Sequence, residues 1–359
     1  MSANKRVLVA MSGGVDSSTA ATLLKRQGYD VVGVGMRLPE PPSAEADEGA
    51  CCGLDGMDDA RRVAHRVGFP FYVVNYEELF ENEVIDYFCR AYAKGRTPNP
   101  CVVCNRRLKF GRLLELADSM ECDFIATGHY ARVERDSDSG RHLLKKGLDS
   151  TKDQSYFLYS LSQEQLARSV FPLGELTKDE TRELAASLDL PVAERPSTQD
   201  ICFVGDQDYR QFLEDRHPDA FRPGPIVDTG GRELGRHEGV ARYTVGQRRG
   251  LGIAAGEPLY VVDLDGESNT VVAGTAEELE IGEIRVERVN WIAFEEPPHE
   301  MRVGVKARYG MPEQPVTVHA RGAEKAEITC DEPQRGVAPG QSAVFYQGDV
   351  VVGGGVIER

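Results

Sequence analysis

Residues 7–18 read Val-Leu-Val-Ala-Met-Ser-Gly-Gly-Val-Asp-Ser-Ser, a short apolar run that leads into a glycine turn. The run has the length and composition of a buried parallel strand. After the turn, apolar residues recur at helical spacing as far as Gly28, and residues 29–36 form a second β-branched run. In such a strand–turn–helix–strand unit, the helix N-terminus presents free backbone N–H groups to an anion. The sequence therefore predicts an anion site at the turn, and we expect a nucleotide phosphate there.

The glycine turn has no lysine at the position where the Walker A pattern carries one, which excludes a kinase-type phosphate loop. The sequence Ser-Gly-Gly-x-Asp-Ser after a first strand instead resembles the PP-loop of the ATP pyrophosphatases. That family splits ATP between its α and β phosphates and adenylates a substrate. An ordinary βα turn is the other interpretation, but such turns rarely carry Gly-Gly and Asp-Ser-Ser together.

Runs of β-branched residues alternate with helical patterns as far as residue 127, which predicts a doubly wound parallel sheet. We expect this α/β fold, of the adenine nucleotide alpha hydrolase-like kind, to form a PP-loop ATP-binding catalytic domain over residues 1–205. Its ligands would lie beyond the carboxyl ends of the strands, where the glycine turn also lies. Hairpin signals and short strands follow, and they predict a small linking domain over residues 206–280 and a C-terminal β-barrel over residues 281–359.

The composition limits where the protein acts and what it binds. Its net charge of −16 argues against a surface that coats nucleic acid uniformly, so an RNA contact must use local basic patches. The chain shows neither a secretory signal pattern nor an apolar run near the ~20 residues of a membrane span. We therefore expect a cytoplasmic protein with no membrane partner, monomeric when free. Its eight cysteines suggest a reducing compartment, where clustered cysteines are catalytic or metal-binding more often than disulfide-bonded.

Two cysteines, Cys101 and Cys104, follow the irregular Thr-Pro-Asn-Pro segment, whose prolines exclude regular structure at its start. Arg106, Arg107 and Lys109 come directly after them. Cationic neighbours and a helix N-terminus lower the pKa of a thiol, so we expect both thiols to be partly thiolate at neutral pH. The same cations can hold RNA phosphates, or they can form no more than a solvated helix face. A further cysteine, Cys202, follows a loop near the end of the first domain.

Several motifs in one order resemble the bacterial tRNA-specific 2-thiouridylases, the MnmA family, over nearly the whole chain. They are the PP-loop, Cys-x-x-Cys, Thr-Gly-His-Tyr at 127–130, Lys-Asp-Gln-Ser-Tyr-Phe-Leu-Tyr at 152–159 and the Cys202 segment. The resemblance implies a tRNA-uridine 2-sulfurtransferase that uses ATP to adenylate O2 of the wobble uridine. Enzyme-bound sulfur then replaces that oxygen, and AMP and pyrophosphate are released. The implied partners are tRNA and a persulfide-donating sulfur carrier or cysteine desulfurase, with residues 206–280 contributing to the tRNA contact.

The residues of that family carry over to this chain by motif. By resemblance, Cys202 carries the persulfide, and Cys104 attacks it to release sulfide or to close a transient disulfide. The implied cofactors are ATP and Mg²⁺, and Asp16 is a candidate ligand of the ion. The ATP contacts map onto Ala10, Met11, Ser12, Gly13, Gly14, Val15, Asp16, Ser17, Met36 and Gly128. The tRNA contacts map onto Asn99, Pro100, Cys101, His129, Lys152, Asp153, Gln154, Arg308, Tyr309 and Gln341.

This chain departs from many members of the family at Cys101, where they carry aspartate. Cys101, Cys104 and Cys202 together could be metal ligands that hold a 4Fe-4S cluster, so the persulfide route and the cluster route both stay open. A zinc site would need Cys51 or Cys52 as a fourth ligand.

Two other classes of function also remain. A PP-loop ligase of a small metabolite, like argininosuccinate or NAD synthetase, would not need three cysteines, and a non-enzymatic RNA-binding or iron–sulfur regulator would not need the intact PP-loop.

Overall fold

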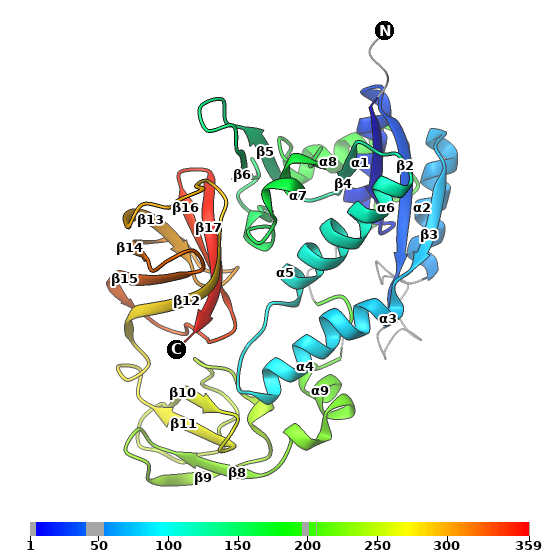
Figure 1. Cartoon of the computed structure of the whole chain (residues 1–359). Helices are drawn as coiled ribbons and strands as arrows, with labels where there is room; N and C mark the ends of the chain where they lie inside the picture. The colour runs from blue at the N-terminus through cyan, green and yellow to red at the C-terminus, as the bar shows by residue number, and fades with distance from the viewer. Residues whose placement is uncertain (1–4, 41–53, 196–200, 206, 359) are drawn as a thin grey trace.

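The computed structural model describes residues 5–40, 54–195, 201–205 and 207–358 (Figure 1). Its N-terminal part contains a sheet of parallel strands in the order β3–β2–β1–β4–β7. These strands are β1 (Arg6–Ala10), β2 (Asp30–Arg37), β3 (Phe71–Asn75), β4 (Phe124–Ala126) and β7 (Ser169–Val170). The strand order reverses between β1 and β4, so the crevice beyond their carboxyl ends is where this fold places a ligand.

Helices cover both faces of this sheet, because both faces of β1 are apolar. Val7 and Val9 pack in one core with residues of α1 (Val15–Arg26), α2 (Leu54–Val67) and α8 (Lys178–Ser187). Leu8 packs in a second core on the opposite face. The predicted doubly wound parallel sheet is thus confirmed, and Gly28, with a φ of +90°, ends α1 as expected.

Two long helices supply the second face, and each contains a π-helical segment. The first consists of α3 (Glu77–Phe80), η1 (Glu81–Ile85) and α4 (Asp86–Ala93), and the second of α5 (Pro100–Cys104), η2 (Asn105–Arg112) and α6 (Leu113–Ser119). The second helix begins at Pro100, since a proline at the first helical position lacks only an N–H that would be unpaired there. The Asn99 side chain caps it by accepting a hydrogen bond from the Val102 amide at 3.4 Å. Regular structure therefore includes Cys101 and Cys104, which are the second and the fifth residue of α5.

The C-terminal strands form a closed barrel, as predicted. They are β12 (Ile281–Trp291), β13 (Glu300–Lys306), β14 (Gln314–Ala320), β15 (Lys325–Gln334), β16 (Ser342–Gln347) and β17 (Val350–Glu358). Their order is β12–β15–β14–β13–β16–β17, and β17 pairs back with β12. The N-terminal part also contains a hairpin of β5 (Ala131–Arg135) and β6 (His142–Lys146), and β6 pairs with β17 in antiparallel orientation. Arg96 also donates two hydrogen bonds to Glu358 at 2.8 and 2.7 Å, so β17 is attached to the PP-loop domain through this pair as well as through the hairpin.

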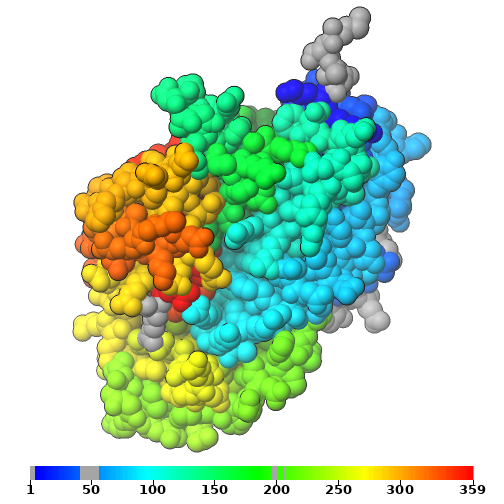
Figure 2. All heavy atoms as spheres, viewed as in Figure 1, coloured from blue at the N-terminus to red at the C-terminus, as the bar shows by residue number. Residues whose placement is uncertain are grey.

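A small module joins the two larger bodies (Figure 2). Its sheet has the order β10–β11–β8–β9, made of β8 (Gly224–Val227), β9 (Glu233–His237), β10 (Tyr260–Asp265) and β11 (Thr270–Gly274). The remaining helical elements are η3 (Ser155–Phe157), α7 (Gln163–Ala167), α9 (Tyr209–Arg216), η4 (Pro218–Ala220) and η5 (Val240–Arg242). Among the described residues, no helix combines the length and the apolar character needed to cross a membrane.

Candidate functional site

A cavity of about 300 Å³ lies beyond the carboxyl ends of β1 and β4. Its wall joins three parts of the chain that are far apart in sequence: the glycine turn, the first turn of α5, and residues 201–203. All but one of the predicted ATP contacts line it: Ala10, Met11, Ser12, Gly14, Val15, Asp16, Ser17, Met36 and Gly128. Cys104, Cys202, Pro100, Cys101, His129 and Gln154 line the same cavity.

The glycine turn is shaped by its own hydrogen bonds and by close packing. The Ser17 hydroxyl accepts a hydrogen bond from the Ser12 amide at 3.2 Å and donates one to the Gly14 carbonyl at 3.2 Å. Gly13 does not line the cavity, but it has a φ of +81°, and a Cβ there would lie 2.0 Å from the Gly56 carbonyl oxygen. A Cβ on Gly128 would lie 2.8 Å from the Ser17 nitrogen, so this position also requires glycine.

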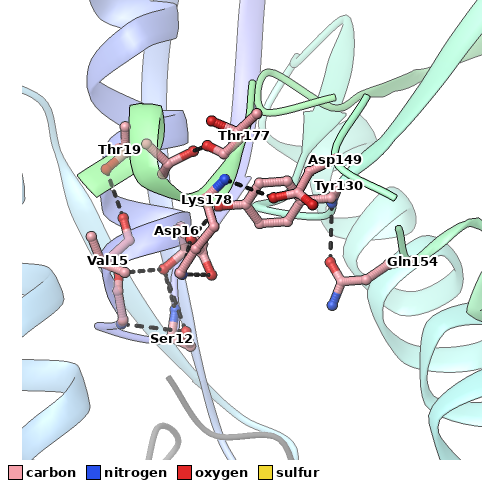
Figure 3. A network of polar contacts seen from close by, with 12 residues as sticks. Ser12, Val15, Asp16, Thr19, Tyr130, Asp149, Gln154, Thr177 and Lys178 are labelled. Atoms are coloured by element: carbon pink, nitrogen blue, oxygen red, sulfur yellow. Dashed lines mark hydrogen bonds and ion pairs between the residues drawn. The ribbon is translucent and has the colours of Figure 1, made fainter. Parts of the chain in front are cut away.

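The Asp16 carboxylate is held by two residues that the sequence analysis did not identify. The Lys178 ammonium donates to Oδ1 at 2.6 Å and to Oδ2 at 2.8 Å, and the Tyr130 hydroxyl donates to Oδ1 at 2.9 Å (Figure 3). The Lys178 amide in turn donates to the Asp149 carboxylate at 3.0 Å. Because the glycine turn lacks the lysine of a Walker A loop, a cation that balances charge at this turn must come from another segment of the chain. Nothing in the sequence singles out Lys178 among 42 lysines and arginines, however.

This arrangement decides how Mg²⁺ fits the site. Among the described residues, Asp16 is the sole carboxylate in the cavity wall, and no three His, Cys, Asp or Glu side chains are grouped to hold a metal ion. Magnesium commonly binds through one or two carboxylates together with substrate phosphates. Asp16 fits that role with the phosphates as further ligands.

The cysteine side of the cavity is apolar. Cys101 and Cys104 project from α5, Cys202 precedes Phe203, and the wall between them includes Leu38, Phe80, Val84 and Phe203. Cys104 is buried, whereas Cys101 and Cys202 are exposed. The three thiols thus share one cavity, although they are not grouped as a metal site within the described part of the chain. Cys51 and Cys52, needed for the zinc alternative, lie outside the described residues.

The expected thiolate character of Cys101 and Cys104 is wrong. Cys101 is open to the cavity on one side, but the protein packed around it raises the pKa of its thiol to about 11. Burial also raises the pKa of Cys104, and only the Lys109 ammonium acts to lower both values. The arginines do not contribute, because Arg107 pairs with Glu83 and Arg112 with Glu115 on the outside of the helix.

His129 and Gln154 lie between the two sides. The Nδ1 atom of His129 is 2.7 Å from the Thr127 hydroxyl, and burial, with a smaller contribution from Lys109, holds the pKa of His129 well below its usual value. The imidazole is therefore neutral. The Gln154 side chain accepts a hydrogen bond from the Tyr130 amide at 3.0 Å, and the Gln154 backbone amide donates to the Tyr130 carbonyl at 2.9 Å. Tyr130 thus connects Gln154 to Asp16.

The other predicted tRNA contacts lie outside this cavity. Asn99 caps α5, Lys152 is half-buried, and Asp153 is buried, accepting hydrogen bonds from the Gly147 and Ser155 amides at 3.1 Å. The Gln341 side chain donates to the Thr97 carbonyl at 3.1 Å, so it holds the segment before α5.

Two predicted contacts on the barrel face solvent. Arg308 is exposed, and the Tyr309 ring, also exposed, lies 4.4 Å from that of Phe157. Both side chains are accessible to a macromolecular substrate. Asp153 and Gln341, in contrast, have structural partners that account for their positions.

Comparison with known proteins identifies relatives along the whole chain. Residues 5–206 match the tRNA methyl transferase HUP domain, residues 210–275 the tRNA methyl transferase PRC-barrel domain, and residues 281–357 the aminomethyltransferase beta-barrel domain. The tRNA-specific 2-thiouridylase MnmA of Moorella thermoacetica is 52% identical, covering 98% of this chain and 99% of its own. MnmA 1 of Thermoanaerobacter pseudethanolicus is 50% identical, and the match covers 100% of this chain and 99% of the relative. MnmA of Clostridioides difficile is 46% identical, and the match covers 99% of each chain. The chain therefore belongs to the tRNA-specific 2-thiouridylase family.

Proposed function

We propose that this chain is an ATP-dependent tRNA-uridine 2-sulfurtransferase that replaces O2 of the wobble uridine by sulfur. The observation that carries the proposal is the single cavity that joins the glycine turn to Cys104 and Cys202. A carbonyl oxygen leaves readily only after it has been activated, and sulfur must then reach the activated carbon. The two chemical requirements, a phosphate-binding turn and a sulfur nucleophile, meet in this cavity.

In the first step, O2 of the uracil attacks the α-phosphorus of ATP, and the bond from that phosphorus to the bridging oxygen breaks. The leaving pyrophosphate is stabilised by backbone N–H groups of the turn and by the N-terminus of α1. Bound Mg²⁺ would neutralise phosphate charge, with Asp16 as its protein ligand. We propose that the neutral His129 and Gln154, which line the same cavity as the glycine turn, hold the target base against the nucleotide.

In the second step, the Cys104 thiolate attacks the inner sulfur of a Cys202 persulfide, and the bond to the terminal sulfur breaks. The hydrosulfide released attacks C2 of the uracil, the carbon–oxygen bond breaks, and AMP leaves. A Cys104–Cys202 disulfide remains, and a thiol reductant must open it before the next turnover. Cys104 gives up its proton to a base in the solvent, and because burial raises the pKa of its thiol this ionisation becomes more favourable as the pH rises.

The 4Fe-4S route is the second candidate for the sulfur step. It is favoured by one observation, the presence of a third cysteine, Cys101, in the same cavity wall. It requires that three sulfurs come together on one cluster, whereas they are not grouped in that way among the described residues. The persulfide route needs only Cys104 and Cys202, and we propose it for that reason. The sulfur would be delivered by a persulfide carrier or a cysteine desulfurase, and the exposure of Cys202 supports such a delivery.

The function is tested by incubating the protein with unmodified tRNA, ATP, Mg²⁺ and a persulfide donor, followed by mass spectrometry of the nucleosides. We expect 2-thiouridine, with AMP and pyrophosphate formed in equal amounts. A tRNA with cytidine at the wobble position is the matched control. If AMP forms without thiouridine, and a small amine or carboxylate is ligated instead, the metabolite-ligase alternative replaces this proposal.

A further inference from the structure

Lys178 is a buried lysine at a position that its local sequence disfavours. It is the first residue of α8, where Thr177 and Glu180 form a capping box. The positive end of a helix favours acidic side chains and repels an ammonium. Burial adds to this cost, since the Lys178 side chain is only 9% exposed. A residue that breaks a local rule without being on the surface is expected to serve a function.

The contacts of Lys178 indicate what that function is. Its ammonium binds both oxygens of Asp16, whose own backbone belongs to the first turn of α1, directly after the glycine turn. The two residues are 162 positions apart in the chain. Lys178 does not line the cavity, whereas Asp16 does, so Lys178 acts on the cavity through Asp16.

Charge explains why the glycine turn needs this partner. ATP brings several negative charges to the turn, and Asp16 places a further one in the wall that receives them. An uncompensated carboxylate would repel the phosphates, and solvent screens this repulsion only in part because the Asp16 side chain is 31% exposed. In a Walker A loop the cation comes from the loop itself. In this chain α8 provides it from outside.

We propose that Lys178 is a positioning residue for adenylation. Its ammonium neutralises Asp16 and fixes the direction of that carboxylate, so that the turn accepts the phosphates of ATP. Tyr130, which donates to the same carboxylate and is hydrogen-bonded to Gln154, extends the arrangement to the side where the target base would lie (Figure 3). The inference rests on the proposed use of ATP by this chain.

The test measures the affinity for a non-cleavable ATP analogue, with a methylene group between the α and β phosphates, by calorimetry. Lys178→Met is expected to weaken binding by about 10- to 100-fold, since a full charge near the phosphates becomes uncompensated. Lys178→Arg, which keeps the charge, should bind within a few-fold of the wild type. The double variant Asp16→Asn with Lys178→Met should recover the affinity of Asp16→Asn alone, because no charge then needs compensation.

A purely structural role for Lys178 would give a different pattern. If the double variant binds the analogue clearly more weakly than Asp16→Asn alone, the lysine acts by packing α8, and the inference is wrong. Wild-type affinity in Lys178→Met would also overturn it. Thermal unfolding without nucleotide gives an independent readout, in which Lys178→Met should lower the midpoint more in the wild-type background than in the Asp16→Asn background.

The wild-type control separates this inference from the proposed function. A wild-type chain that binds the analogue and thiolates tRNA, but shows no coupling between the two substitutions, overturns the role of Lys178 alone. A wild-type chain that binds no nucleotide overturns both. In the steady state, Lys178→Met should raise the KM for ATP more than it lowers kcat, whereas loss of folded protein would lower kcat alone.

Discussion

The two sides of the cavity are built in opposite ways. The nucleotide side comes mainly from one continuous stretch, residues 10–17, and this stretch is held by hydrogen bonds and by the Lys178–Asp16 pair. The cysteine side combines two distant segments with an apolar wall, and it raises the pKa of its thiols. Phosphates need fixed donors and balanced charge, whereas a sulfur nucleophile benefits from a wall that excludes water. The difference suggests that the first side is preorganised and the second holds its reactive groups protonated until they are used.

The strongest expected effect is a loss of thiolation without a loss of nucleotide binding, when a cysteine on the cysteine side of the cavity is replaced. Cys104→Ser and Cys202→Ser should each reduce thiolation by at least about 1,000-fold, because the sulfur-handling atoms are removed. Binding of the ATP analogue should stay within about twofold of the wild type in both, as the thiols belong to other segments of the chain than the glycine turn. Cys330→Ser, in the barrel, is the matched control. Residual thiolation above that limit in Cys104→Ser would show that another group releases the sulfur.

Asp16→Ala should abolish adenylation, measured as pyrophosphate release in the presence of tRNA. The Lys178 ammonium is buried and would lose its partner in this variant. We therefore expect the free energy of unfolding to fall by about 1–3 kcal/mol, measured by chemical denaturation. Asp16→Asn should lose less stability, because its side-chain oxygen still accepts a hydrogen bond. Normal pyrophosphate release in Asp16→Ala would contradict the role of this residue.

The variant Cys101→Ala distinguishes the persulfide route from the 4Fe-4S cluster route. In the persulfide route the variant should keep thiolation within about threefold of the wild type, because Cys104 and Cys202 remain. In the cluster route, iron is lost or labile and thiolation falls to the level of the other two cysteine variants. Anaerobic purification and reconstitution, with iron content, visible absorption and thiouridine yield recorded, gives the answer. A colourless, iron-free wild type that thiolates at full rate excludes the cluster.

The raised thiol pKa values predict a pH dependence confined to the sulfur step. A thiol with a raised pKa is mostly protonated at neutral pH, and its thiolate fraction grows about tenfold per pH unit until the pKa is reached. Single-turnover thiolation should therefore accelerate from pH 7 to 9, while binding of the ATP analogue changes little. Lys109→Met should move the rate curve to higher pH, because the Lys109 ammonium lowers the pKa of both thiols. Lys109→Arg is the control, and a rate that does not change with pH would contradict this account of the thiols.

The smallest expected effect concerns the outer face of the α5–α6 helix. Of the three cations that follow Cys104 most closely, Arg106 and Arg107 are exposed, whereas Lys109 lines the cavity, so of these three the two arginines are available to tRNA phosphates at the surface. Arg106→Ala with Arg107→Ala should flatten the salt dependence of tRNA binding by roughly one unit of log–log slope for each phosphate that is no longer neutralised. Arg61→Ala, on α2, is the matched control. An unchanged slope would mean that the two arginines are a solvated helix face.

The sequence by itself was sufficient for features that depend on local pattern. The apolar run of β1, the glycine turn and the start of α1 follow from neighbouring residues, and so does the C-terminal succession of alternating strands. The resemblance to the 2-thiouridylases also implied that the glycine turn and the Cys-x-x-Cys pair serve one reaction. The inferences from local pattern hold because backbone geometry and side-chain periodicity are short-range properties.

Only the tertiary structure decided the charge state and the partners of the side chains. Lys178 reaches Asp16 across 162 positions, and no local pattern specifies such a contact. The arginines near Cys104 suggested a low thiol pKa, but the helix directs them outward and the apolar wall raises the pKa instead. Likewise, the β5–β6 hairpin joins β17 of the barrel, which no local pattern indicates. Burial and electrostatic environment depend on which distant segments pack together, and for that physical reason they are properties of the folded chain.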